Sequence, residues 1–337
     1  MKPYVTLIAL IFTLLLFPQR MLAQNALVTD FLEKNLSVSG QTVKVSDLQG
    51  ALSGDLTIGA ITIADDAGIW FRLEGGRLNW SRTALLTGAL NIQDLSAQRI
   101  TIFRRPSLDA PTPARQSGPI SLPQLPDLPI TAQIDRFAIQ QIIIADAYDD
   151  GPLIANSTGS LDYGAGILDA ALMLNITNGR QEALDLTARI TAQDEISAQL
   201  KYFEQAGGAV AQAAGFIHNA PLTMTLQAQG HSTNIKTNIA LTTGQTSTDQ
   251  MSHVDGALTL ISDDQGSHIR GTVSGDLSPL IDTPISALKR AGRIDLTLDA
   301  TRAVDNTTHL RKLSLSSDVL SLNGALNLDE TGWPTAL

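Results

Sequence analysis

Apolar side chains recur at every second position along most of this chain, and short turns interrupt the runs. In the first block, from Val43 to Ile102, pairs such as Leu56 and Ile58 alternate with polar residues. Successive side chains of a strand point to opposite sides, so this alternation predicts strands with one apolar and one polar face. Turn-forming stretches such as Glu74-Gly75-Gly76 separate the runs. The pattern therefore predicts an all-β protein.

The same alternation resumes at Ile130 and continues almost to the last residue. The clearest local signal is Asn178-Gly179 between two alternating runs, which is typical of a β-hairpin. Consecutive hairpins favour one long antiparallel meander, and no sequence signal indicates closure into a barrel. The residues that we expect to form the apolar face are Leu56, Ile58, Ile61, Ile63, Leu184, Leu186, Leu222, Met224, Leu226, Leu258, Leu260, Ile294, Leu296, Leu298, Leu320 and Leu322.

Residues 1–24 have the composition of an export segment. Lys2 precedes an apolar run over residues 5–17, which as a helix spans roughly 20 Å, less than the ~30 Å hydrocarbon core of a bilayer. This length predicts a signal peptide. Met21 is large for the third position before a cut after Ala23, so an uncleaved signal anchor is the alternative. Either reading places the remainder of the chain outside the cytoplasm.

A proline-rich stretch divides the remainder of the chain. Residues 25–104 begin with a short amphipathic helix over Asn25–Leu36 and continue as the first block of strands. The many prolines of residues 105–129 predict an extended connector, and a PxxP ligand at Pro123–Pro126 is the alternative. Residues 130–337 then form the second block of strands.

Composition excludes several classes of protein. The net charge is -10 and aromatic residues make up only 4%, so a nucleic-acid binder is not expected, because phosphates repel acidic chains and bases stack on aromatic rings. Hydrophobic residues at 43% against charged residues at 17% exclude a disordered chain. The chain has no cysteine, which rules out disulfides and thiol chemistry.

We find no set of residues in the sequence that predicts catalysis, a metal site or a cofactor. Each of three acidic pairs lies at a strand break and is followed shortly by glycine, which is turn chemistry: Asp65-Asp66, Asp149-Asp150 and Asp263-Asp264. The five histidines are dispersed, without the spacing of metal ligands. What remains to explain is the apolar face itself.

An aliphatic sheet face must be covered, because exposed apolar area is unfavourable by about 25 cal/mol per Å². Three coverings are open from the sequence: the sheet folds on itself around a dry core, it pairs with a second copy, or it leaves a groove that an apolar ligand fills. Composition alone favours the dry core, since packed interiors are the common outcome.

Specific motifs add to this picture. They are Val45–Ser53, Leu56–Gly59, Ile61–Trp70, Leu73–Gly75, Leu78–Arg82, Ala84–Gly88, Arg99-Ile100 and Arg104–Pro106, followed later by Leu122–Pro126, Gly275–Leu280 and Gly332–Pro334. Together they resemble the TamB family of the translocation and assembly module, over essentially the whole chain.

The resemblance implies a taco-shaped sheet whose aliphatic interior forms a long groove, similar to the AsmA-like bridge proteins that carry phospholipid between two membranes. The apolar-face residues named above would then line the groove and contact lipid. The family is also associated with outer-membrane protein and autotransporter assembly through a barrel partner, TamA. Family members are several times longer, so we expect this chain to be an amino-terminal piece, truncated before the region that engages that partner.

The complete expectation is an elongated, curved antiparallel sheet with an open groove, an N-terminal membrane-targeting helix and a few short helices. It would lie in the periplasm of a Gram-negative bacterium, anchored in or associated with the inner membrane. It would bind phospholipid or other apolar cargo and support lipid transport and protein insertion or secretion at the outer membrane, without enzymatic activity. The alternative is an exported structural β-solenoid or adhesin with a dry core and no lipid cargo.

Overall fold

The computed structural model of this chain is all-β, with one short helix among the described residues. It describes residues 29, 33, 40–50, 53–107, 131–148, 151–179, 181–208, 210–211, 220–245, 250–276, 292–329 and 334–336. The all-β class predicted from the alternation is confirmed. The expected export segment, nearly all of the expected helix over Asn25–Leu36 and most of the proline-rich connector lie outside the described residues.

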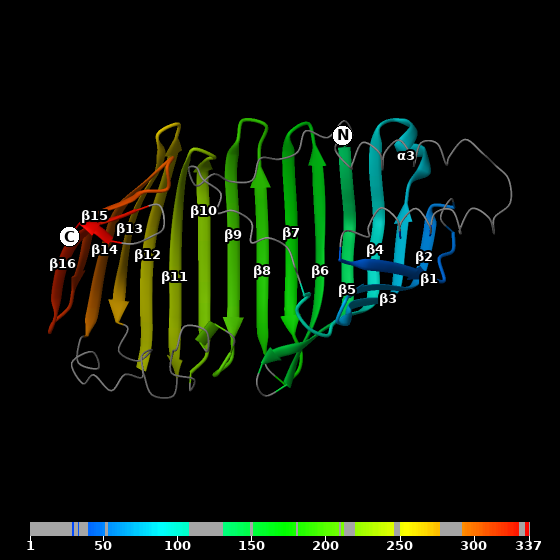
Figure 1. Cartoon of the computed structure of the whole chain (residues 1–337), viewed down its shortest axis with the longest axis horizontal. Helices are drawn as coiled ribbons and strands as arrows, with labels where there is room; N and C mark the ends of the chain where they lie inside the picture. Colours follow the sequence, from blue (N-terminus) through cyan, green and yellow to red (C-terminus); the bar gives the residue numbers. More distant parts are fainter. Residues whose placement is uncertain are drawn as a thin grey trace. The chain divides into compact units, whose positions relative to one another are not determined.

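Two compact units divide the chain. The N-terminal unit comprises residues 1–110 and 129–162, and the C-terminal unit comprises residues 111–128 and 163–337. The elements that begin in the N-terminal unit are β1 (Thr42–Ser46), β2 (Asp55–Asp65), β3 (Gly68–Trp80), α3 (Arg82–Leu86), β4 (Ala89–Ile102), β5 (Thr131–Tyr148) and β6 (Gly151–Gly164). They are labelled from blue to green in Figure 1.

Between β4 and β5 the N-terminal unit departs from a pure antiparallel meander. Strands β1 to β4 pair antiparallel in chain order, but β5 pairs parallel to β4, with Thr131 opposite Ala89 and Ile144 opposite Ile102. A parallel partner requires the chain to return along the whole length of β4, about 46 Å for 14 residues. The return takes place between Ile102, where β4 ends, and Thr131, where β5 begins.

In two neighbouring segments of the N-terminal unit, the spacing between successive apolar residues changes from two positions to three. At the end of β1 the step is from Val45 to Leu48, which lies just after the strand, and in β2 it is from Ile58 to Ile61. Asp47, inside the first step, has a positive φ of 53°, and Gly59, inside the second, donates its N–H to the carbonyl of Asp47 at 3.3 Å. A Cβ on Gly59 would lie 2.6 Å from the Asp47 Cβ, so only glycine fits.

This irregular row lets both halves of β2 contact the same apolar cluster. Val43, Val45 and Leu48 are buried, and the β2 residues on both sides of Gly59 pack against them: Leu56, Ile58, Ile61 and Ile63. Strict alternation would have placed the two pairs on opposite faces of the strand.

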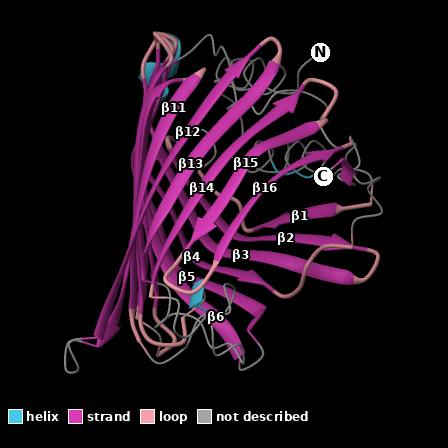
Figure 2. Cartoon of the chain, turned by 90° about the vertical axis from the view of Figure 1, so that its left-hand side faces the viewer, coloured by secondary structure: helices cyan, strands magenta, loops and turns pink. Residues whose placement is uncertain are grey.

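The C-terminal unit is a meander of antiparallel neighbours. Its strands are β7 (Ile167–Ile176), β8 (Glu182–Ile190), β9 (Glu195–Glu204), β10 (Leu222–His231), β11 (Asn234–Gln245), β12 (Gln250–Asp263), β13 (Gly266–Asp276), β14 (Arg293–Ala303), β15 (Thr308–Ser316), β16 (Ser321–Leu328) and β17 (Pro334–Ala336). From β7 to β17 each strand pairs with the next in chain order. Figure 2 shows β11 to β16 side by side and strongly twisted.

Within this unit, the described residues give no pairing that joins β7 to β16 or β17, so this part of the sheet is not closed. The predicted hairpin at Asn178-Gly179 is present: Gly179 has a φ of 82° and follows β7 just before β8. Among the residues that the structure describes, no helix has the length and apolar character needed to cross a bilayer.

Candidate apolar binding face

The register of the C-terminal unit brings its aliphatic residues together in rows that cross the strands. Residues directly opposite each other in antiparallel pairs share a face of the sheet, so a row can be followed from strand to strand. The central row, from β7 to β16, consists of Leu172, Leu186, Leu200, Leu226, Ile239, Gly256, Val273, Leu296, Leu315 and Leu322. Every member except Gly256 is a leucine, isoleucine or valine.

Parallel rows on both sides of the central row continue the same chemistry. The row on one side is Leu174, Leu184, Tyr202, Met224, Leu241, Val254, Gly275 and Ile294. The row on the other side is Ala170, Ala188, Ala198, Ala228, Thr237, Leu258, Gly271, Leu298, Leu313 and Gly324. We call these three rows, with the residues beside them on the same side of the sheet, the aliphatic face.

The structure places the apolar residues chosen from the sequence as follows. Those of the C-terminal unit lie on the aliphatic face, including Leu222 and Leu260 beside the three rows. The exception is Leu320, which lies in the turn before β16, where its carbonyl accepts the Ser317 N–H at 2.8 Å. The four β2 residues belong to the apolar cluster of the N-terminal unit and are described with that unit alone.

Burial differs along the aliphatic face. At one end Leu222 is only 1% exposed, whereas Leu226 on the same strand is partly exposed and Leu322 on β16 is 53% exposed. Substantial contacts between the described elements of this unit join only neighbouring strands. Within the described residues, therefore, no second layer covers the middle of this face.

A buried polar cluster lies at the well-buried end. Glu182, Tyr202 and Glu204 are 2%, 9% and 0% exposed, and the register places all three on the aliphatic face. The Tyr202 hydroxyl lies 2.9 Å from Glu182 Oε2 and 2.8 Å from Glu204 Oε2. Burial, followed by these hydrogen bonds, raises the pKa of Tyr202 far above its ordinary value, so the hydroxyl keeps its proton.

Glu204 also binds the backbone at Val210 and Ala211. Its carboxylate accepts the backbone N–H groups of Val210 and Ala211, both at 2.8 Å. A Cβ on Gly208 would lie 2.4 Å from Glu204 Oε2, so the close approach needs glycine there. Sequence reasoning missed this cluster, although two glutamates and a tyrosine at positions otherwise occupied by aliphatic residues were a visible signal.

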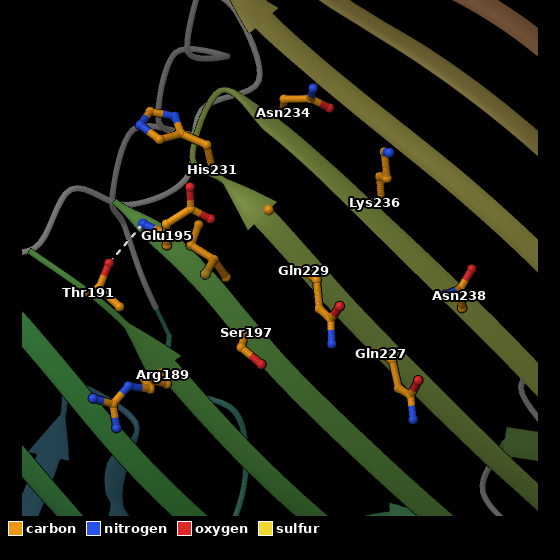
Figure 3. A pocket seen from close by; sticks show the side chains of 12 residues that line it. Arg189, Thr191, Glu195, Ser197, Gln227, Gln229, His231, Asn234, Lys236 and Asn238 are labelled. Carbon is orange, nitrogen blue, oxygen red and sulfur yellow. Dashed lines mark hydrogen bonds between the residues drawn. The ribbon is translucent and has the colours of Figure 1, made fainter. Parts of the chain in front are cut away.

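The opposite side of the sheet is polar. Figure 3 shows a shallow hollow there, lined by side chains of β8 to β11 that include Arg189, Gln227, Gln229 and Lys236. Most of these groups are exposed to solvent, and Arg189 is paired with Asp169 at 3.1 Å. The hollow therefore offers hydrogen-bonding groups of mixed charge but no buried, oriented acid and base.

The acidic pairs serve as turns where the structure describes them. Asp65 accepts the Ala67 N–H at 2.9 Å, and Asp263 accepts the Gln265 N–H at 2.8 Å. Asp65 is also clamped by both terminal nitrogens of Arg104, and this hydrogen-bonded guanidinium holds the pKa of the Asp65 carboxyl far below its usual range. Asp149-Asp150 lies outside the described residues. No cluster of metal-ligating side chains occurs among those the structure describes.

The arrangement can therefore offer aliphatic contact over a wide area, and the described residues bring no nucleophile and base together at a pocket. Comparison of the chain with protein-family models, with curated proteins and with solved structures gives no match.

Proposed function

We propose that the C-terminal unit binds the acyl chains of phospholipid on its aliphatic face. The observation that carries this proposal is the set of three mainly aliphatic rows that cross the strands from β7 to β14, two of them continuing to β16, without a covering layer among the described residues. Contact with water at such rows is unfavourable by about 25 cal/mol per Å² of apolar area, so a stable state requires an occupant.

The chemistry of the rows favours an acyl chain over other apolar ligands. Tyr202 is the sole aromatic residue in the three rows, so flat ligands find few stacking partners. The rows contain no charged residue, which suits a ligand that is featureless along its length. Neighbouring strands are about 4.8 Å apart, so the central row runs roughly 43 Å across the sheet, longer than the ~30 Å hydrocarbon core of a bilayer.

In the cell, the proposal follows the resemblance to the TamB family. The chain would be a periplasmic protein associated with the inner membrane, with its sheet curved into a groove that carries phospholipid toward the outer membrane. It would support protein insertion and secretion there together with the barrel partner TamA, and it would catalyse no reaction. The sequence motifs support this placement, and the aliphatic face supports the lipid part of it.

Photo-crosslinking from the aliphatic face tests the proposal. A photoreactive amino acid replaces Leu226, Leu258 or Leu296, the full chain is expressed in a Gram-negative host, and the adducts are identified by mass spectrometry. All three positions lie on the aliphatic face. We expect phospholipid adducts from each of them.

Matched controls use the adjacent residue of the same strand. Gln227, Thr259 and Thr297 point to the opposite, polar side, so they sample the same depth of the sheet without the apolar rows. Phospholipid adducts of equal yield from these controls would refute the proposal. Adducts only within the chain, from the three leucine positions, would show a dry core and favour the structural solenoid or adhesin instead.

A further inference from the structure

One strand of the C-terminal unit ends its apolar series with an arginine. On β14 every second residue lies on the side of the aliphatic face, and this series is Ile294, Leu296, Leu298, Ala300 and Arg302. The register places Ile269 of β13 opposite Ala300 and Ser267 opposite Arg302. Arg302 therefore lies on the same side of the sheet as the aliphatic rows, at their edge.

The row that contains Arg302 differs in chemistry from the row beside it. The row beside it, followed from β12 to β16, is aliphatic throughout: Leu260, Ile269, Ala300, Leu310 and Leu326. The row of Arg302, which we call the border row, is Ser262, Ser267, Arg302, Thr308 and Leu328. The hydroxyl oxygens of Ser262 and Ser267 lie 3.3 Å apart, and Ser267 is only 1% exposed. Hydroxyl and guanidinium groups thus border the aliphatic face at this end of β12 to β15.

Arg302 carries a positive charge that no carboxylate of the described residues neutralises. Asp299 of the same strand points to the opposite side of the sheet, where it binds a histidine and an arginine. Asp305, in the turn after β14, accepts the N–H and the hydroxyl of Thr307 at 2.9 and 2.6 Å. The positive charge of Arg302 is thus available to an anion that approaches from the aliphatic side.

The guanidinium of Arg302 is held at one nitrogen and has no acceptor at another. Its Nη2 donates to Asn306 Oδ1 at 2.9 Å, and the Asn306 N–H donates to the Ala303 carbonyl at 3.0 Å within the turn after β14. Its Nε is buried without a hydrogen-bond partner. A buried donor without an acceptor is unfavourable, and an anionic oxygen would supply a charge-assisted hydrogen bond. Phosphate suits a guanidinium well, because its oxygens match the planar fork of N–H donors.

The apolar series on β14 is long enough to accommodate an acyl chain that begins near Arg302. From Ala300 to Ile294 the strand covers about 20 Å, at roughly 3.3 Å per residue. Half of the hydrocarbon core of a bilayer, which holds the acyl chains of one leaflet, is about 15 Å thick. A phosphate at Arg302 therefore leaves the attached acyl chains fully within the aliphatic face.

We propose that Arg302, with the border row around it, binds the phosphate of a phospholipid whose acyl chains lie on the aliphatic face. This inference rests on the proposed function, because it assigns the headgroup end of the same ligand. The guanidinium donates to the phosphate oxygens, and Thr308, directly opposite on β15, places a hydroxyl beside it. The lipid is thereby oriented, with its headgroup at the turn between β14 and β15 and its acyl ends toward Ile294.

Competition between two lipids tests the inference. The full chain in detergent micelles is incubated with equal amounts of phosphatidylglycerol and diacylglycerol that carry the same acyl chains, and retained lipid is counted by native mass spectrometry. The net charge of -10 repels anions in general, so a preference for the anionic lipid requires a local positive group. We expect the wild type to retain about tenfold more phosphatidylglycerol, and Arg302→Gln to lose this preference while it still retains diacylglycerol.

Arg293→Gln is the matched control, because Arg293 lies exposed on the polar side of the same strand and its loss removes the same charge. This variant should keep the wild-type preference. Equal retention of both lipids by the wild type, an unchanged preference in Arg302→Gln, or an equal loss in Arg293→Gln would overturn the inference and leave the proposed function standing. Retention of neither lipid would overturn both.

Two further measurements complete the test. Displacement of phosphatidylglycerol by an equal concentration of glycerol 3-phosphate would overturn the inference, because it would show a site for free phosphate that gains nothing from the acyl chains. Should Arg302→Gln fail to fold, Arg302→Lys takes its place. This variant keeps the charge but loses the planar fork, so the preference should fall severalfold, and an unchanged preference would overturn the inference.

Discussion

Substitution of two leucines on one strand tests whether the aliphatic face is packed along its whole length or is partly open to a ligand. Leu222 begins β10, and Leu226 lies four residues further along this strand on the same side of the sheet. Leu222 is 1% exposed, and Leu226 is only partly buried. Replacing each with alanine removes the same atoms from two different environments.

The expected magnitudes differ because only one site leaves a cavity. Leucine to alanine removes three carbon groups at about 0.8 kcal/mol each when they are fully buried, and the empty space adds more, giving about 2–5 kcal/mol for Leu222→Ala. At Leu226 part of the side chain already meets solvent and water fills the space that is left. We therefore expect Leu226→Ala to cost about 1–1.5 kcal/mol.

Urea unfolding of purified, lipid-free chain measures both values from the shift in the transition midpoint at an unchanged slope. A cost above about 2.5 kcal/mol for Leu226→Ala, equal to that of Leu222→Ala, would refute the reasoning, because it would show that the middle of the aliphatic face is packed as a dry core. Addition of phospholipid should stabilise the wild type more than Leu226→Ala, since ligand binding to the folded state adds to its stability.

Two further perturbations test the turns and the clamp. Gly230 has a φ of 135°, and a Cβ there would lie 2.2 Å from the Asn234 carbonyl oxygen. Gly230→Ala should therefore lower the free energy of unfolding by about 1–3 kcal/mol in the same urea assay. The control Gly324→Ala should be nearly neutral, because the space around Gly324 is open. Arg104→Gln removes the guanidinium that pairs with Asp65 and holds the pKa of this carboxyl below its ordinary value. The Arg104–Asp65 pair therefore stabilises the fold above the unfolded pKa of about 3.9, and this stabilisation is lost as the pH falls through the folded pKa. The Arg104→Gln variant should therefore melt at a lower temperature than the wild type at pH 7, and the difference in melting temperature should become smaller in acid. Arg105 is the exposed neighbour, and an equal fall in melting temperature in Arg105→Gln would contradict this explanation.

The strands and the aliphatic face were predictable from the sequence because alternation is a local property. Leu184 and Leu186, or Leu296 and Leu298, share a face in any strand that contains them. Their meeting across the sheet follows from short hairpin turns such as Asn178-Gly179, which leave little freedom in register.

Features that depend on distant partners were not predictable in the same way. The parallel pairing of β5 with β4 depends on where Thr131 docks along β4, and the spacing of apolar residues does not indicate that position. The approach of Val210 and Ala211 to the Glu204 carboxylate is likewise encoded by no periodic pattern. Such contacts arise from tertiary packing and carry no signature in the spacing of residues.

A change in the spacing of apolar residues marks a backbone irregularity in β15. In β15 the step from Leu310 to Leu313 is three residues, and strict alternation would send the second leucine to the polar side. The register shifts at this point against β16, and against β14 between Asp299 and Ala300, as expected for a bulge that accommodates one extra residue. Leu313 therefore stays opposite Leu298 on the aliphatic face.

The N-terminal unit also has a step of three, just after β1 at Asp47 and within β2 at Gly59, where it accompanies a positive φ and a glycine-only contact. In both units a spacing of three within an alternating run marks a backbone irregularity that keeps apolar residues together. Without the bulge in β15, Leu313 and Leu315 would lie on the polar side, and the aliphatic face would end at β14. The extent of the aliphatic face thus depends on where alternation is interrupted as well as on alternation itself.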